Sequence, residues 1–186
     1  MQTKNNGVVR YALSLLADHI LAIMAAVLIS NFFRFFSDDG FPVITQILCL
    51  IILFLVFYVD SWKRGCSDGS RIRLGRMKKN YFRGFIVGLV ATIPGLFFAI
   101  GAFLAESGII RFYDLFGELD IFTVFFRIWN LPLAGFFEFA NELPVINFVV
   151  LLFMPVVAGI GYVLGLHEIT LKQVFVYKSE DEEDDE

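Results

Sequence analysis

The stretch Asp60–Arg83, DSWKRGCSDGSRIRLGRMKKNYFR, carries eight of the fifteen Lys and Arg residues of the chain and lies between two long apolar runs. A charged side chain costs about 2.5–3.5 kcal/mol at the centre of a bilayer, so this stretch cannot lie in lipid. Because basic loops stay on the cytoplasmic side of a membrane, we expect a cytoplasmic basic loop over residues 60–83. Its basic residues are Lys63, Arg64, Arg71, Arg73, Arg76, Lys78, Lys79 and Arg83.

The composition of the 186-residue chain supports this interpretation. Hydrophobic residues make up 58% of the chain and charged residues 18%, whereas an ordinary soluble domain has about 45–50% and 25%. The apolar residues form runs of about 20, which is the length of a helix that crosses roughly 30 Å of hydrocarbon. We expect one all-α polytopic membrane domain over residues 1–178. Its four predicted spans are residues 13–33, 43–59, 84–104 and 144–166.

The distribution of charge sets the expected orientation. With four spans both termini are cytoplasmic, and the cytoplasmic segments then hold twelve Lys and Arg residues against three outside, Arg34, Arg111 and Arg127. Glu180–Glu186 are all acidic, and without them the formal net charge of −4 becomes +3. Since a block of like charges is disordered, we expect a disordered acidic tail over residues 179–186. This tail is simply solvated, competes with lipid for the basic loop, or recruits a basic protein.

Small residues recur at helical spacing in the third and fourth spans. Such stripes let two helices approach closely, so we expect these two spans to pack through them. Pro94 and Pro155 lie in the middle of the same spans and should kink them. The predicted packing glycines are Gly84, Gly88, Gly95, Gly161 and Gly165.

Residues 105–143 are too polar for a plain span and too apolar for a plain loop. Apolar residues recur at helical spacing from Ile109 to Trp129, with acidic residues between them. This pattern favours an amphipathic or re-entrant helical segment at the outer membrane surface. The alternative is a fifth span over Ile121–Phe137, which would place Arg127 inside the bilayer.

Two short segments have the pattern of strands. Residues Arg71–Leu74 alternate polar and apolar side chains, and Gln173–Lys178 also has an extended pattern. One hypothesis pairs them as a small cytoplasmic β-ribbon. The alternative is a loop without strands.

Asp18 is the main ionisable residue inside a predicted span. Such a residue is a functional candidate by default. The alternative is structural, because Asp18 is close enough to the cytoplasmic interface to pair with Arg10 or with an arginine of the basic loop.

No pattern of residues indicates an active site. The two histidines, His19 and His167, are not spaced as metal ligands, and no glycine-rich stretch has the spacing of a phosphate-binding loop. Cys49 and Cys66 are not spaced as a metal or redox pair, so we expect free thiols. We therefore expect no enzyme activity, no cofactor and no metal.

Several short motifs resemble an uncharacterised family of small multi-span membrane proteins from Gram-positive bacteria. They are Trp62–Gly65 with Asp68 and Gly75-Arg76, Arg83-Gly84 with Gly88-Leu89, Ile93-Pro94, and Pro155, Gly159, Gly161-Tyr162 and Leu164-Gly165 before Leu171 and Val176–Lys178. The resemblance implies a bacterial plasma-membrane protein and no particular activity. Arg10, Asp18 and the glycine-rich basic loop are also similar to the RDD membrane family, although a GxxxGK-like loop core is missing.

These features favour a non-enzymatic membrane accessory or scaffold protein that acts through helix packing and its basic loop. The alternative is a small transporter or channel component in which Asp18, Pro94 and Pro155 line a path. We expect its partners to be the bilayer, anionic lipid headgroups at the basic loop, and a membrane protein or a second copy of the chain. We expect no nucleic-acid partner.

Overall fold

The computed structural model describes residues 3–36, 42–107, 121–134 and 145–169, and these residues form an all-α fold. Four stretches of helix are long and apolar enough to cross a membrane: Gly7–Phe36, Val43–Arg73, Arg83–Ala105 and Phe148–Leu166. The prediction of a polytopic all-α protein with four spans is therefore confirmed. In chain order the elements are α1 (Thr3–Phe36), α2 (Pro42–Arg73), α3 (Arg83–Glu106), α4 (Ile121–Trp129), the 3-10 turn η1 (Leu131–Leu133), α6 (Val145–Leu151) and α7 (Phe153–Leu166).

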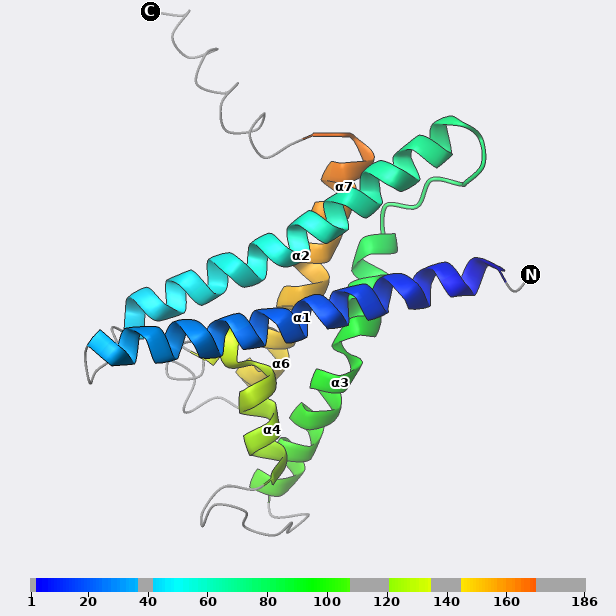
Figure 1. Cartoon of the computed structure of the whole chain (residues 1–186). Helices are drawn as coiled ribbons and strands as arrows, with labels where there is room; N and C mark the ends of the chain where they lie inside the picture. The colour runs from blue at the N-terminus through cyan, green and yellow to red at the C-terminus, as the bar shows by residue number, and fades with distance from the viewer. Residues whose placement is uncertain (1–2, 37–41, 108–120, 135–144, 170–186) are drawn as a thin grey trace, which may run out of the picture.

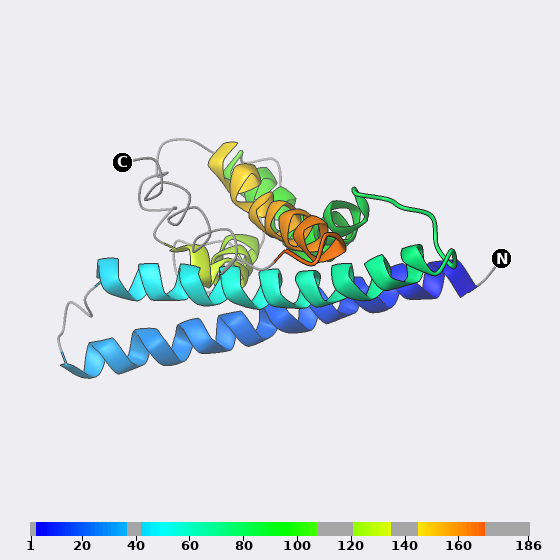
Figure 2. The same cartoon turned by 90° about the horizontal axis from the view of Figure 1, so that it is seen from above.

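The long helices are arranged in two layers that cross each other (Figures 1 and 2). The antiparallel pair α1 and α2 forms one layer, and α3 with α6 and α7 forms the other. Helix α7 packs most extensively on α2 and then on α3, so it is the element that joins the layers. The short helix α4 lies along α3.

The core lies where the two layers cross. Leu15 of α1, Phe57 of α2, Val87 of α3 and Tyr162 of α7 are all fully buried there. The outer faces are apolar too, as at Phe35, which is 87% exposed. A soluble monomer rarely exposes so much apolar surface, whereas lipid is a suitable solvent for it.

Helix α2 is longer than predicted and contains most of the predicted basic loop. It has 32 residues, which is roughly 48 Å at 1.5 Å per residue and exceeds the hydrocarbon thickness. The prediction that a loop begins at Asp60 is wrong, because the helix continues to Arg73. Residues 74–82 alone connect α2 to α3.

A glycine C-cap explains where α2 ends. Gly75 has φ of +69°, a conformation that glycine adopts without strain. The Gly75 N–H donates to the Ile72 carbonyl and the Arg76 N–H to the Arg71 carbonyl, both at 2.9 Å. These two bonds form a Schellman motif. The predicted strand at Arg71–Leu74 is therefore wrong, and its proposed partner, 173–178, lies outside the described residues.

The two prolines have different effects. Helix α3 continues on both sides of Pro94. Near Pro155 the fourth span is divided into α6 and α7 at Leu152, whose N–H donates to the Val149 carbonyl in a 3-10 arrangement. Pro155 lies in the first turn of α7, where its missing N–H would have had no partner within the helix.

The segment between α3 and α6 is described for residues 121–134. Helix α4 has nine residues, roughly 14 Å, so it is too short for the alternative fifth span. It buries Thr123 and Phe126 against the bundle. The turn η1 is tied to α2 by Gln46, whose Nε2 donates to the Pro132 carbonyl at 2.8 Å. Residues 108–120 and 135–144 lie outside the described residues.

Close contacts at glycines hold α7 against its neighbours. A Cβ atom added at Gly165 would lie 2.2 Å from the Trp62 carbonyl oxygen, and one at Gly65 would lie 2.3 Å from that of Tyr162. Gly161 also packs closely on α2, because a Cβ atom added there would lie 2.9 Å from the Tyr58 carbonyl oxygen. The prediction that Gly161 and Gly165 pack on the third span is thus wrong, because this face of α7 contacts α2.

The glycines of α3 have two different neighbours. A Cβ at Gly84 would lie 2.4 Å from Tyr162 Cβ, and one at Gly88 would lie 2.6 Å from Pro155 Cα. Both positions therefore lie at the contact with α7. Gly95 faces two side chains, those of Trp129 at the end of α4 and Leu151 at the end of α6. A Cβ atom added at Gly95 would lie 2.9 Å from the indole nitrogen of Trp129 and 2.9 Å from Leu151 Cδ2, so this glycine also contacts the fourth span.

We predict that Gly165→Ala destabilises the protein, by about 1–3 kcal/mol, because a methyl group there cannot avoid the α2 backbone. The matched control is Gly159→Ala on the same helix, where the added Cβ meets only Phe85, at 3.3 Å or more. The control should be within about 1 kcal/mol of wild type, helped by the better helix propensity of alanine. Unfolding in detergent measures both, and equal effects would contradict the packing described.

Candidate functional site

Five exposed basic residues gather at the end of the bundle where α2 leads into α3. We call it the basic end and define it by the exposed side chains of Arg71, Arg73, Arg76, Lys78 and Lys79. Behind these residues, on the inner face of α2, lies a carboxylate that is only 7% exposed, that of Asp68.

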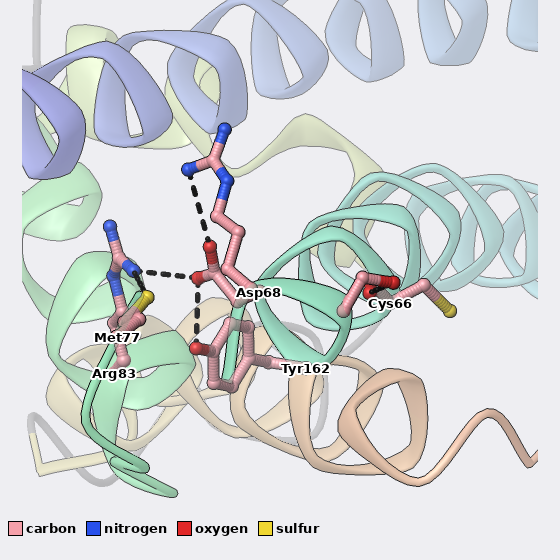
Figure 3. Close-up of polar contacts among 7 residues, drawn as sticks. Cys66, Asp68, Met77, Arg83 and Tyr162 are labelled. Carbon is pink, nitrogen blue, oxygen red and sulfur yellow. Dashed lines mark hydrogen bonds and ion pairs between the residues drawn. The ribbon is translucent and has the colours of Figure 1, made fainter. Parts of the chain in front are cut away.

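Asp68 is held by groups from two other helices (Figure 3). Its Oδ2 atom accepts a hydrogen bond from Arg83 Nη1 at 2.6 Å and another from the Tyr162 hydroxyl at 2.9 Å. Its Oδ1 atom lies 3.7 Å from Nη1 of Arg71, one turn further along α2. We call Asp68, Arg83 and Tyr162 the Asp68 clamp, because they join α2, α3 and α7.

The local sequence explains how the clamp can form. Gly65 and Gly69 on either side of Asp68 bring α2 so close to α7 that Cβ atoms there would meet the backbone of Tyr162 and Leu166. Tyr162 is fully buried, so its hydroxyl has to find a partner inside the bundle. Arg83 is the first residue of α3, where its side chain can reach across to α2.

The electrostatics make the clamp a strong constraint. The side chains of Arg83 and Asp68 are 19% and 10% exposed, so both charges have lost most of their hydration. Hydrogen bonds between ionised groups are shorter and stronger than neutral ones. Removing one member of such a pair leaves an uncompensated buried charge, which costs about 3–5 kcal/mol.

The predicted basic residues fall into two groups. Arg83 belongs to the clamp, and Arg64 is half-buried with its guanidinium 5.6 Å from the centre of the Tyr11 ring. The remaining predicted positions are exposed, and among them Arg73 forms an ion pair with Glu168 beyond the end of α7. The exposed members are Lys63, Arg71, Arg73, Arg76, Lys78 and Lys79.

A second polar cluster lies between α1 and α2. The Ser14 hydroxyl donates to Asp60 Oδ2 at 3.1 Å. Asp18 is half-buried one turn further along α1, and its Oδ2 atom is buried without a hydrogen-bond partner in the described part of the chain. The charged groups that act on Asp18 belong to α2, namely Lys63, Asp60 and Arg64. Of the two predicted kinds of partner, Arg10 is not among these groups, whereas Arg64, an arginine of the predicted basic loop, is.

The clamp was missed in the sequence because Asp68-Gly69 has the composition of a turn. The overlooked signal is the spacing of four between Gly65 and Gly69, which matches that of Gly161 and Gly165. Two such stripes predict a close helix crossing. A carboxylate between the glycines of one stripe then has to lie near that crossing.

Chemically, the clamp is suited to holding helices together. Asp68 forms hydrogen bonds with both Arg83 and Tyr162. Within residues 3–36, 42–107, 121–134 and 145–169, no group of three or more His, Cys, Asp or Glu side chains could hold a metal ion. The two thiols, Cys49 and Cys66, are free.

Four apolar spans in two crossing layers define a polytopic all-α membrane protein. Comparison of the chain with protein-family models, curated proteins and solved structures finds no match. Function is therefore inferred from the residues themselves.

We predict that Asp68→Asn destabilises the protein by about 3–5 kcal/mol, because it leaves the Arg83 charge buried without its partner. Tyr162→Phe should cost about 1.5–3 kcal/mol, the usual range for a hydrogen bond to a charged group. The matched control is Arg73→Met, which removes an ion pair whose side chains are 57% and 51% exposed and should cost at most about 1 kcal/mol.

Unfolding in detergent measures these differences, and the double variant Asp68→Asn/Arg83→Met tests the coupling. Its cost should be well below the sum of the two single costs, since neither charge then remains. Additive costs would mean that the two residues do not act as a pair.

Proposed function

We propose that this membrane protein is a non-enzymatic accessory or scaffold protein of a bacterial plasma membrane, with both termini and the basic end in the cytoplasm. In this role the basic end binds anionic phospholipid headgroups. The helix bundle is presented to a membrane-protein partner or to a second copy of the chain.

The observation that supports this proposal best is the mixture of side chains at the basic end. Large apolar residues stand among the exposed cations: Leu74 is 67% exposed, Tyr81 45% and Phe82 71%. A surface that carries cations and apolar side chains together suits the boundary between headgroups and acyl chains. Each Lys or Arg near an anionic leaflet contributes about 1 kcal/mol.

The Asp68 clamp supports the same role. It neutralises Arg83, whose side chain enters the bundle, and leaves the exposed cations to face the membrane surface. It also fixes the direction in which α2 leaves the bundle. The predicted basic loop is therefore a continuation of α2 over Asp60–Arg73, and only residues 74–82 connect α2 to α3.

We predict that neutralising the connector cations weakens binding of anionic lipid. The variant Arg76→Gln/Lys78→Gln/Lys79→Gln loses three charges, so its affinity for phosphatidylglycerol should fall by about 3 kcal/mol, on the order of 100-fold. The control Arg34→Gln/Arg127→Gln removes exposed cations away from the basic end and should retain the wild-type affinity. Native mass spectrometry of purified protein titrated with phosphatidylglycerol or phosphatidylcholine measures this difference.

Two results of that titration would refute lipid binding at the basic end. One is an unchanged affinity of the triple variant for phosphatidylglycerol. The other is equal binding of phosphatidylglycerol and phosphatidylcholine by the wild type.

A second candidate function, a component of a cation transporter or channel, is favoured by one observation. Asp18 Oδ2 is buried without a hydrogen-bond partner among the described residues, next to the carboxylate of Asp60. Ionisable groups within a span are typical of ion and proton pathways. The break between α6 and α7 near Pro155 would then lie along the path, as in transporters with broken spans.

We predict that wild-type protein and Asp18→Asn give the same proton, Na⁺ and K⁺ fluxes in proteoliposomes as liposomes without protein. The measurement uses an internal pH-sensitive dye, with Na⁺ or K⁺ gradients imposed in separate experiments. A protein-dependent flux that Asp18→Asn abolishes would establish the second candidate in place of the first.

A further inference from the structure

His19 is buried at the point where the two layers meet α4. It is 3% exposed, and its ring contacts two aromatic rings: it is stacked on that of Phe57 at 5.8 Å and tilted against that of Trp129 at 4.8 Å. A polar ring in this position needs partners for both of its nitrogens.

The hydrogen bond of His19 determines which nitrogen carries the proton. Its Nε2 atom lies 2.9 Å from the Trp129 carbonyl oxygen, and a carbonyl can only accept. Nε2 is therefore the N–H donor, and in the neutral imidazole Nδ1 is the acceptor. Nδ1 is buried and has no hydrogen-bond partner in the described part of the protein, so it needs a donor.

A small cavity of about 20 Å³ adjoins His19. A cavity volume of about 10–15 Å³ is enough to hold one water molecule. Its lining is mostly apolar, but it includes two further polar side chains, Thr92 of α3 and Asn130 after α4. These side chains are 9% and 2% exposed.

The hydrogen bonds of these two side chains leave complementary groups. The Thr92 hydroxyl donates its proton to the Gly88 carbonyl at 2.8 Å, so its oxygen still has lone pairs to accept with. The Asn130 amide donates one N–H to the Phe126 carbonyl at 3.1 Å and has a second N–H to donate.

We propose that this cavity binds one water molecule within the membrane-spanning bundle. The water donates one hydrogen to His19 Nδ1 and the other to Thr92 Oγ1, and its oxygen accepts the second N–H of Asn130. Three hydrogen bonds are typical for a buried water. The site links α1, α3 and the residue before η1, and it holds the two layers together away from the basic end.

The test is ¹⁵N NMR of the full chain labelled at histidine and held in nanodiscs. The chain has two histidines, so His167→Gln assigns the signals. We expect Nε2 to be protonated, Nδ1 to have the shift of a hydrogen-bonded acceptor, and the ring to show a cross-peak to a long-lived water. A protonated Nδ1, or the shift of a free lone pair without a water cross-peak, would overturn the proposal.

A variant pair locates the water. Thr92→Val removes one acceptor from the cavity at nearly constant side-chain shape, so the Nδ1 signal should shift and the water cross-peak should weaken. The matched control is Thr123→Val, another buried threonine that does not line the cavity, and it should leave both signals unchanged. The wild-type spectrum alone tests the proposal, so the test remains valid even if one of the variants fails to fold.

Discussion

A carboxylate that leaves water must be paired, and the pairing of Asp68 determines how three of the helices meet. Arg83 and the Tyr162 hydroxyl converge on the same oxygen atom of Asp68. Each partner comes from a different helix, so the position of α2 cannot change without exposing or isolating a buried charge. The glycine contacts of α2 and α7 and the C-cap at Gly75 all lie close to this group along α2.

The basic residues near Asp68 therefore have two different roles. Arg83 neutralises a carboxylate inside the bundle, while Arg76 and its exposed neighbours remain at the surface with Leu74 and Phe82. Surfaces that combine exposed cations with exposed apolar groups bind well at the boundary between headgroups and acyl chains. The proposed scaffold role depends on the second group of residues, and the shape of the bundle depends on the first.

The spans were predictable from sequence because an apolar run of about 20 residues has few alternatives in a membrane. The length of α2 could not be predicted in this way, because charged residues indicate where the hydrocarbon region ends but not where a helix ends. Gly65 and Gly69 lie within the predicted basic loop, and only the neighbouring backbone of α7 shows why a helix needs glycine at these positions. The residue that ends α2 is Gly75, the glycine of its C-cap. The His19 cavity was also out of reach, because Thr92 and Asn130 are brought to it by tertiary packing.

The most direct test of the Asp68 clamp is the distance between α2 and α3 in the membrane. Spin labels at the exposed positions Ser67 and Ile86, with Cys49 and Cys66 replaced by alanine and serine, report this distance by double electron–electron resonance in nanodiscs. A clamped bundle gives one narrow distance distribution, which becomes broad when Asp68→Asn is added. A broad distribution without that substitution, or a narrow one that it leaves unchanged, would contradict the clamp as the group that fixes these helices.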